Sequence, residues 1–140
     1  MSNNARVLVR SMDTLEVEEC MEFLEQAQFG RIAHCAGDRV EIIPVNYAFF
    51  EGAVVIRTDF GDRLDQLAAG PPASFQVDAI DHDARTGWSV VVQGTTEEVS
   101  DPGELARLRE LDLEPWAPGD RDHFVRVLPS RITGRRLHLE

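Results

Sequence analysis

The stretch RVEIIPVNYAFFEGAVVIRT, residues 39–58, decides the fold class. Branched and aromatic apolar residues fill its first part, residues 39–51, and this composition is typical of a long β-strand. Glu51-Gly52 predicts a turn, and AVVIRT, residues 53–58, predicts a second strand. The stretch therefore indicates a protein built mainly from β-strands joined by short turns.

The strand over 39–51 is apolar on both of its faces. One face carries Ile43, Val45, Tyr47 and Phe49, and the other carries Ile42, Pro44, Ala48 and Phe50. An antiparallel strand with one face in water should alternate apolar and polar residues instead. We therefore expect a helix or a second subunit to cover one wall of the sheet, and a two-fold homodimer is the simplest cover.

The rest of the chain adds more strands and a few short helices. We predict strands over 29–36, 73–80, 88–99 and 123–140, the last interrupted near Pro129, and helices over 14–27, 62–70 and 102–112. A capping-box pattern at Asp13–Glu16 and the pair Asp101-Pro102 mark two helix starts. Residues 81–87 read as a polar loop and 114–122, with Trp116, as irregular. Six or so strands in this order indicate an antiparallel barrel or sandwich, not a doubly wound sheet.

Length and charge exclude several classes of protein. At 140 residues we expect one domain over 1–140, with 1–12 as a flexible N-terminal segment. The net charge of -11 leaves no basic face for nucleic acid or for an anionic membrane surface. No apolar run approaches the roughly 18 residues of a membrane span, and no signal peptide precedes the domain, so we expect a cytoplasmic protein. All basic residues are arginines, so arginine or backbone amides must hold any bound anion.

Two stretches of this framework are candidates for binding a ligand. Pro44 cannot donate to a strand ladder, so IIPVNYAF either lets a ligand lie along its backbone or is a kink with Asn46 bonded internally. In VIRTDFGDRL, residues 55–64, Arg57, Thr58 and Arg63 surround the start of a helix, and together they could bind one phosphate. The alternative is that these arginines pair with the neighbouring aspartates on the surface.

Other motifs carry weaker signals. Asp81-His82-Asp83 predicts a solvated turn, and Cys20 and Cys35 lack zinc-ligand spacing, so we expect neither a metal site nor a disulfide. No nucleophile elbow, dinucleotide fingerprint, Walker or zincin pattern occurs. Trp88, between Gly87 and Ser89 at the head of a core strand, either caps the barrel or forms a wall for a flat ligand. Near the C-terminus, Arg135 or Arg136 must point inward and needs an anionic partner.

The order of these motifs resembles a known family. GRIA, IPVNY, IRTxxGxRL, FQVD, GWSVVVQG, WAPG and TGRRL follow one another over residues 14 to 138. This order is similar to that of the pyridoxamine 5′-phosphate oxidase-like family of FMN-binding split β-barrels, in its small, actinobacterial-type branch. The resemblance implies a six-stranded antiparallel split barrel and a homodimer with FMN at its interface.

The resemblance also implies roles for particular residues. Pro44, Val45 and Asn46 would run along the flavin ring; Arg57, Thr58 and Arg63 would hold the phosphate, with Leu64 beside it; and Trp88 and Ser89 would approach from the opposing subunit. Where many relatives have lysine this chain has Arg63, and it lacks the histidine that relatives linked to nitroimidazole reduction often carry near Arg57. Arg136-Leu137-His138 loosely matches the Arg-x-His signature of the oxidases proper.

Two functions follow from these patterns. The first is a flavin-dependent oxidoreductase acting on a small organic substrate, in which the flavin carries the redox chemistry. The second is a non-catalytic or slow binding protein of the same fold that holds FMN, a deazaflavin or haem. No general acid or base stands out, and Tyr47 is a candidate only because it follows Asn46. A third interpretation is a structural dimer without a cofactor, whose arginines all pair internally.

Overall fold

The structure is a computed structural model that describes residues 10–58, 62–114 and 122–139, the side chains of 62–64 excepted. The described residues form eight strands and three helices. In chain order these are β1 (Arg10–Thr14), α1 (Val17–Gln26), β2 (Phe29–Ala36), β3 (Arg39–Asn46), β4 (Ala48–Phe50), β5 (Ala53–Thr58), α2 (Asp62–Ala68), β6 (Pro72–Asp81), β7 (Thr86–Glu98), α3 (Pro102–Arg109) and β8 (His123–Leu139). None of these helices is long and apolar enough to cross a membrane.

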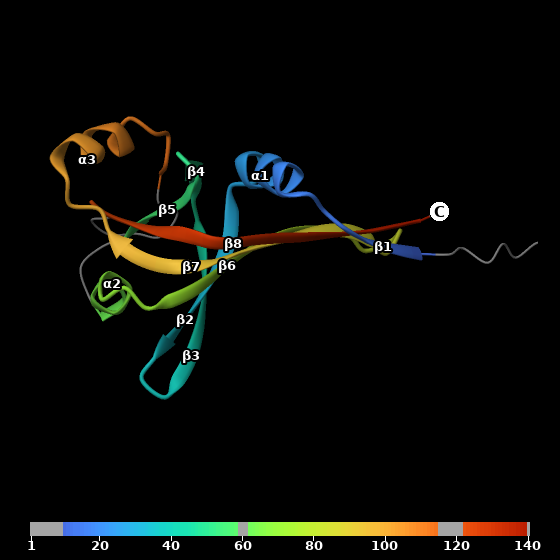
Figure 1. The fold of residues 1–140 in the computed structure, drawn as a ribbon, viewed down its shortest axis with the longest axis horizontal. Coiled ribbons are helices and arrows are strands. Elements are labelled where there is room, and N and C mark those ends of the chain that lie inside the picture. The colour runs from blue at the N-terminus through green and yellow to red at the C-terminus, as the bar shows by residue number, and fades with distance from the viewer. Residues whose placement is uncertain (1–9, 59–61, 115–121, 140) are drawn as a thin grey trace, which may run out of the picture.

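The strands form one antiparallel sheet that curls into a split barrel. Their order is β3-β2-β6-β7-β8-β5-β4, and β1 adds to β8. β3 and β4 follow each other along the chain but lie at opposite ends of this order, so the sheet must curl to bring its two ends together. Figure 1 shows β8 running most of the length of the molecule, with α3, β4 and β5 at one end and β1 at the other. The predicted mainly β, split-barrel fold is confirmed.

The strand predicted over 39–51 is divided at Tyr47. β3 pairs with β2, whereas β4 pairs with β5. Between them the backbone N–H of Tyr47 donates to the carbonyl of Gln28 at 3.1 Å, outside either ladder. The prediction of six strands treats β3 and β4 as one strand and omits β1, which accounts for the difference from eight.

The main core lies inside the curled sheet. Side chains of β2 alternate, and Ile32, His34 and Ala36 point inward and are buried. α1 adds Cys20 and Leu24, one turn apart on the same helix face, and α2 adds Leu67. Burying the apolar side chains of this core stabilises the barrel.

α3 covers a second, smaller core at one end of the molecule. Leu108 of α3 and Leu113 pack with Val55 and Phe124, and Ala48 and Phe50 pack against this cluster. A helix therefore covers part of the second apolar face of the 39–51 stretch, and a helix was one of the two covers that the sequence predicted. Val40 and Ile42, nearer the start of the same stretch, are about two-thirds exposed.

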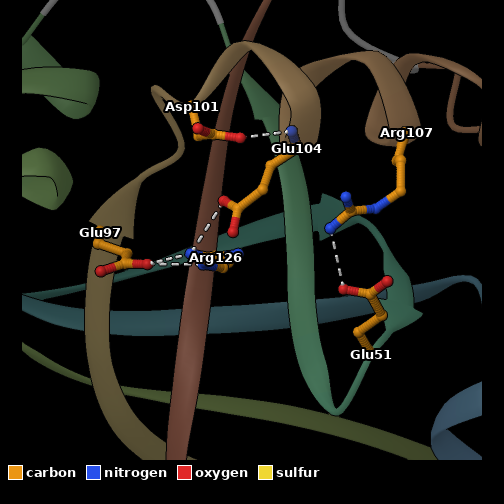
Figure 2. Close-up of polar contacts among 6 residues, drawn as sticks. All are labelled: Glu51, Glu97, Asp101, Glu104, Arg107 and Arg126. Carbon is orange, nitrogen blue, oxygen red and sulfur yellow. Dashed lines mark hydrogen bonds and ion pairs between the residues drawn. The ribbon is translucent and has the colours of Figure 1, made fainter.

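A network of charged residues fixes α3 to the sheet (Figure 2). Asp101 accepts a hydrogen bond from the backbone N–H of Glu104 at 2.9 Å, so the predicted helix start is confirmed. The guanidinium of Arg126 on β8 contacts Glu97 at 2.6 Å and Glu104 at 3.2 Å. Burial opposes the charged form of Arg126, but its bonds to Glu97 and then Glu104 outweigh this and raise its pKa.

The N-terminal elements differ from the prediction. α1 begins after Glu16, and the side chain of Glu16 makes no cap hydrogen bond. Asp13, the first residue of the predicted capping box, lies on β1, and its carboxylate contacts Nε2 of His138 at 2.7 Å. The predicted capping box is therefore wrong. Residues 10–12, predicted to be part of a flexible segment, pair with β8 as part of β1, and residues 1–9 lie outside the described residues.

Two connections also differ from the prediction. The loop predicted over 81–87 shrinks to a turn at 82–85, because β6 and β7 extend and pair from Asp81 and Thr86 inward. β8 continues through Pro129, where the predicted interruption takes the form of a register shift between Gln93 and Gly94. A Cβ on Gly94 would overlap the carbonyl of Leu128, so this close approach requires glycine.

Candidate functional site

Asn46 and Arg57 converge on the segment that follows α3. Nδ2 of Asn46 donates to the carbonyl of Glu114 at 2.5 Å, and a guanidinium nitrogen of Arg57 donates to the carbonyl of Leu113 at 3.1 Å. Because consecutive Cα atoms are only about 3.8 Å apart, these bonds hold the end of β3 and the end of β5 beside each other. The structure therefore brings together two of the predicted site residues.

The guanidinium of Arg57 is held in place from two directions. It lies over the ring of Phe124, 5.2 Å from the ring centroid, in addition to its bond to Leu113. A guanidinium carries a fixed positive charge and a planar set of N–H donors, which is the type of group that binds a phosphate. Thr58, the next residue, is buried, and its cross-strand partner is His123.

His123 and Glu98 extend this end of the sheet, and neither was among the predicted site residues. Nδ1 of His123 lies 2.9 Å from a carboxylate oxygen of Glu98, and both side chains are mostly buried. The contact joins β8 to the end of β7 beside Thr58. Sequence reasoning missed the pair because 25 residues separate the two partners.

Pro44 and Val45 lie on β3, which is the terminal strand of the sheet order. Pro44 is exposed, and Val45 packs against the main core. A terminal strand presents alternate backbone N–H and C=O groups along its free edge, and a ligand can bind to them. Arg63 and Leu64 lie in α2, close after Arg57 and Thr58 in the chain, and their side chains are outside the described residues.

Trp88 contacts α1 in its own chain. Its ring stacks on Phe23, with the centroids 4.1 Å apart, and the guanidinium of Arg136 lies 5.6 Å from the centroid of the Phe23 ring. One face of the Trp88 indole therefore caps the barrel, which was one of the two predicted roles of this residue. Ser89 follows it and points to the opposite face of the sheet, because successive strand residues alternate.

The two groups of predicted residues lie far apart along β8. Arg57 pairs with Phe124 near the start of β8, and Trp88 pairs with Arg136 near its end. At about 3.3 Å per residue, the 12 residue steps from Phe124 to Arg136 correspond to about 40 Å along the strand. Figure 1 shows the same separation, with β5 and the far end of β8 on opposite sides of the molecule.

The sequence and fold together match one family. The family model described as pyridoxamine 5′-phosphate oxidase matches residues 16–136, which is most of the chain. The chain belongs to the pyridoxamine 5′-phosphate oxidase family. This confirms the family that the motif order predicted.

Solved structures of similar proteins agree with this family. A Corynebacterium glutamicum protein whose name carries the same family designation is 34% identical, with a TM-score of 0.80 over 92% of this chain and 95% of that chain. The FAD binding protein from Mycobacterium smegmatis is 33% identical, with a TM-score of 0.74 over 89% and 98%. An FAD-binding protein from Mesorhizobium loti is 28% identical, with a TM-score of 0.75 over 89% and 97%.

In this member of the pyridoxamine 5′-phosphate oxidase family, the residues that resemble the Arg-x-His signature bind other parts of the chain. Arg136 lies 4.0 Å from the carboxylate of Glu19 on α1, and His138 contacts Asp13 on β1. Arg136 thus has a carboxylate of the same chain as its partner, but its side chain is 44% exposed, so the prediction that it points inward is wrong. Arg135, its neighbour, points to the opposite face of the sheet.

Tyr47 cannot transfer a proton in this arrangement. Its side chain is buried, and its hydroxyl donates to the carbonyl of Leu24 at 2.7 Å. Burial raises the pKa of Tyr47 far above its ordinary value. The hydroxyl therefore stays protonated, and its main role is to connect the β3–β4 junction to α1.

The acidic stretch at residues 81–83 forms a hydrogen-bonded turn. Asp81 accepts a hydrogen bond from the backbone N–H of Ala84 at 3.0 Å, which closes the turn. Within residues 10–58, 62–114 and 122–139, no group of three histidine, cysteine or acidic side chains is placed to hold a metal ion. Cys20 is buried and Cys35 is exposed, and both are free thiols.

Proposed function

We propose that this protein binds a flavin and uses it as an oxidoreductase acting on a small organic substrate. Membership of the pyridoxamine 5′-phosphate oxidase family supports the proposal, as do the similar proteins from Mycobacterium smegmatis and Mesorhizobium loti that are named as FAD-binding. A bound flavin supplies hydride or electron transfer, and the protein positions and tunes it.

The residues at the Arg57 end fit a phosphate and a flat ring. Arg57 is oriented by Leu113 and Phe124 and carries the positive charge that a phosphate requires, and Arg63 follows it closely in the chain. The free edge of β3 at Pro44 and Val45 offers backbone groups to the ring. In the proposed site Asn46, Arg57, Thr58 and Arg63 bind the cofactor, and Leu64 packs beside the phosphate.

The main support for a site shared between two chains is the distance along β8 between the two groups of predicted residues. The cross-strand partners of Trp88 and Ser89 lie about 40 Å along β8 from Phe124, the partner of Arg57. One chain therefore cannot bring Arg57 and Trp88 to the same ligand. A homodimer can, because a two-fold axis places one end of each chain against the other end of its partner. The exposed Val40 and Ile42 give such a dimer apolar surface to bury.

The protein's part in the reaction is positioning and water exclusion. Tyr47 does not act as a general acid or base, because its hydroxyl is buried and bonded to Leu24. Ser89 is the hydroxyl that a two-fold partner would offer to the ring. Such a donor shifts the potential of the flavin by stabilising charge on its ring atoms.

The nature of the flavin is open to a direct test. FMN, FAD and a deazaflavin all present phosphate groups and a flat ring, and haem is the alternative ligand in a slow or non-catalytic protein. The visible spectrum of purified protein distinguishes flavin bands from a Soret band. Where the protein is colourless, titration with each cofactor, followed by fluorescence and by thermal stability, identifies the one that binds. Protein that gains no thermal stability from any of them contradicts the proposal.

A further inference from the structure

A pocket of about 270 Å³ lies on the open face of the sheet where β1, β8, β7 and β6 run side by side. Its floor is a single row of cross-strand partners: Met12, Leu137, Gly87 and Ile80. A Cβ on Gly87 would lie 2.9 Å from Cδ1 of Ile80, so the side chain of Ile80 lies close over the glycine. Met12 and Ile80 are both more than half exposed, which is unusual for large apolar residues.

The next row of the same face makes the rim of the pocket polar. Ser89 and Arg135 are cross-strand partners and both line the pocket. Arg135 is the only charged residue among the lining residues. A cation at the rim is notable in a chain with 25 acidic residues and a net charge of -11.

Arg135 differs from two other arginines of β8, Arg136 and Arg126. Arg136 pairs with Glu19 on the other face of β8, and Arg126 pairs with Glu97 and Glu104. No carboxylate within residues 10–58, 62–114 and 122–139 makes an ion pair with Arg135. An arginine left beside an apolar floor suits a ligand that carries both an apolar body and an anionic group.

We propose that this pocket binds a small molecule with an apolar body of one or two rings and a single carboxylate, which contacts Arg135. The volume lies just below the roughly 300–1,000 Å³ typical of drug-sized ligands, which limits the molecule to a small one. Its role as the substrate pocket rests on the proposed function, because Ser89 joins the pocket to the proposed flavin site. The binding of the anion depends only on the residues of the pocket.

The test is calorimetric titration of the full-length protein with naphthoate and with naphthamide, its neutral analogue of the same shape. We expect naphthoate to bind more tightly. Arg135→Ala should weaken naphthoate binding roughly threefold to tenfold, as for an exposed charge-assisted contact, and should leave naphthamide unchanged. Arg131→Ala is the matched control, because Arg131 lies on the same face of β8 opposite Gln93 and does not line the pocket.

The outcomes separate this proposal from the proposed function. Equal affinity for both probes, or equal effects of the Arg135 and Arg131 substitutions, would overturn the pocket. A titration repeated on flavin-saturated protein should retain naphthoate binding, and displacement of naphthoate by the flavin would overturn the substrate role. Protein that binds naphthoate and no flavin would contradict the proposed function and leave the anion pocket standing.

Discussion

Trp88 stacks on Phe23 with the two ring planes 17° apart, and this contact joins the head of β7 to α1. A tryptophan at the mouth of a core strand therefore packs against a helix of its own chain. The stacking uses one face of the indole. Its other face is the part of the indole that a cofactor held by a partner chain would meet in the proposed dimer.

The first prediction concerns this stacked pair. Phe23→Ala and Trp88→Ala should each lower the free energy of unfolding by about 2–3 kcal/mol, less than for fully buried rings because both are partly exposed. The double variant should fall short of the sum by about 0.5–1.5 kcal/mol, the coupling of an aromatic pair. Urea denaturation of the four proteins measures this, and strictly additive losses would show that the contact contributes nothing.

The second prediction concerns the network that holds α3. Arg126→Ala leaves Glu97 and Glu104 facing each other without a cation and should cost about 1–3 kcal/mol. Hydrogen exchange should rise across α3. The control is Arg107→Ala, because its ion pair with Glu51 at 3.4 Å is largely exposed and should be worth less than about 1 kcal/mol. Equal losses in the two variants would mean that Arg126 is an ordinary surface charge.

The third prediction uses Tyr47, the only tyrosine of the chain. Burial raises its pKa in the folded protein, so the folded state keeps the phenolic proton to higher pH than the unfolded state does. Stability from Tyr47 is therefore fully present below the ordinary pKa of about 10 and is lost as the pH rises above it. Ultraviolet titration should show tyrosinate near pH 10 in urea and only at higher pH in the native protein. Coincident titrations would contradict the buried hydrogen bond to Leu24, and Tyr47→Phe should remove the signal.

The fourth prediction concerns the two thiols. Burial, and then the charge of Glu19, raises the pKa of Cys20, and its sulfur packs so closely on Gly134 that a Cβ there would lie 2.6 Å away. Cys20 should therefore resist a thiol reagent in the native protein, whereas the exposed Cys35 reacts quickly. One fast thiol in native protein and two in urea is the expected count. A fast thiol that survives Cys35→Ser would contradict the packing of α1 on β8.

Local patterns predicted much of the fold, because its turns and strands carry their own signals. Gly37 and Gly52 have φ values of 67° and 77°, which only glycine adopts freely, and both mark predicted turns between strands. Asp101 caps α3 as its sequence indicates. Asp13 has an equally good pattern but contacts His138, 125 residues away, and a local pattern cannot anticipate that competition.

The candidate site was harder to predict because its contacts are long-range. Residue types indicated Asn46 and Arg57 as binding groups, but not that both would bond to consecutive carbonyls at 113 and 114. The pair of His123 and Glu98 carries no sequence signal, because it forms only once β7 and β8 align. The division of the long strand at Tyr47 likewise follows from closing the sheet, not from any turn residue.

The last prediction tests whether the proposed flavin site is shared between two chains. Arg57→Ala and Trp88→Leu should each weaken flavin binding, the first by roughly tenfold or more for the loss of a charge-assisted contact. Leucine at position 88 keeps apolar bulk against Phe23. In a mixed dimer one site carries both changes and the other site carries neither. Random reassortment of two homodimers makes about half of the dimers mixed, so about a quarter of all sites should regain the unaltered affinity.

The measurement is a flavin titration of the two variants alone and after unfolding and refolding them together. A tight-binding fraction that appears only in the mixture would support a site formed by Arg57 of one chain and Trp88 of the other. Mixing one variant with itself through the same refolding step is the control. If each chain held a complete site, every site in the mixture would carry one change and no tight fraction would appear. That outcome, or a monomer in sedimentation, would contradict the shared site. A shared site needs two chains, because no single chain places both ends of β8 against one ligand.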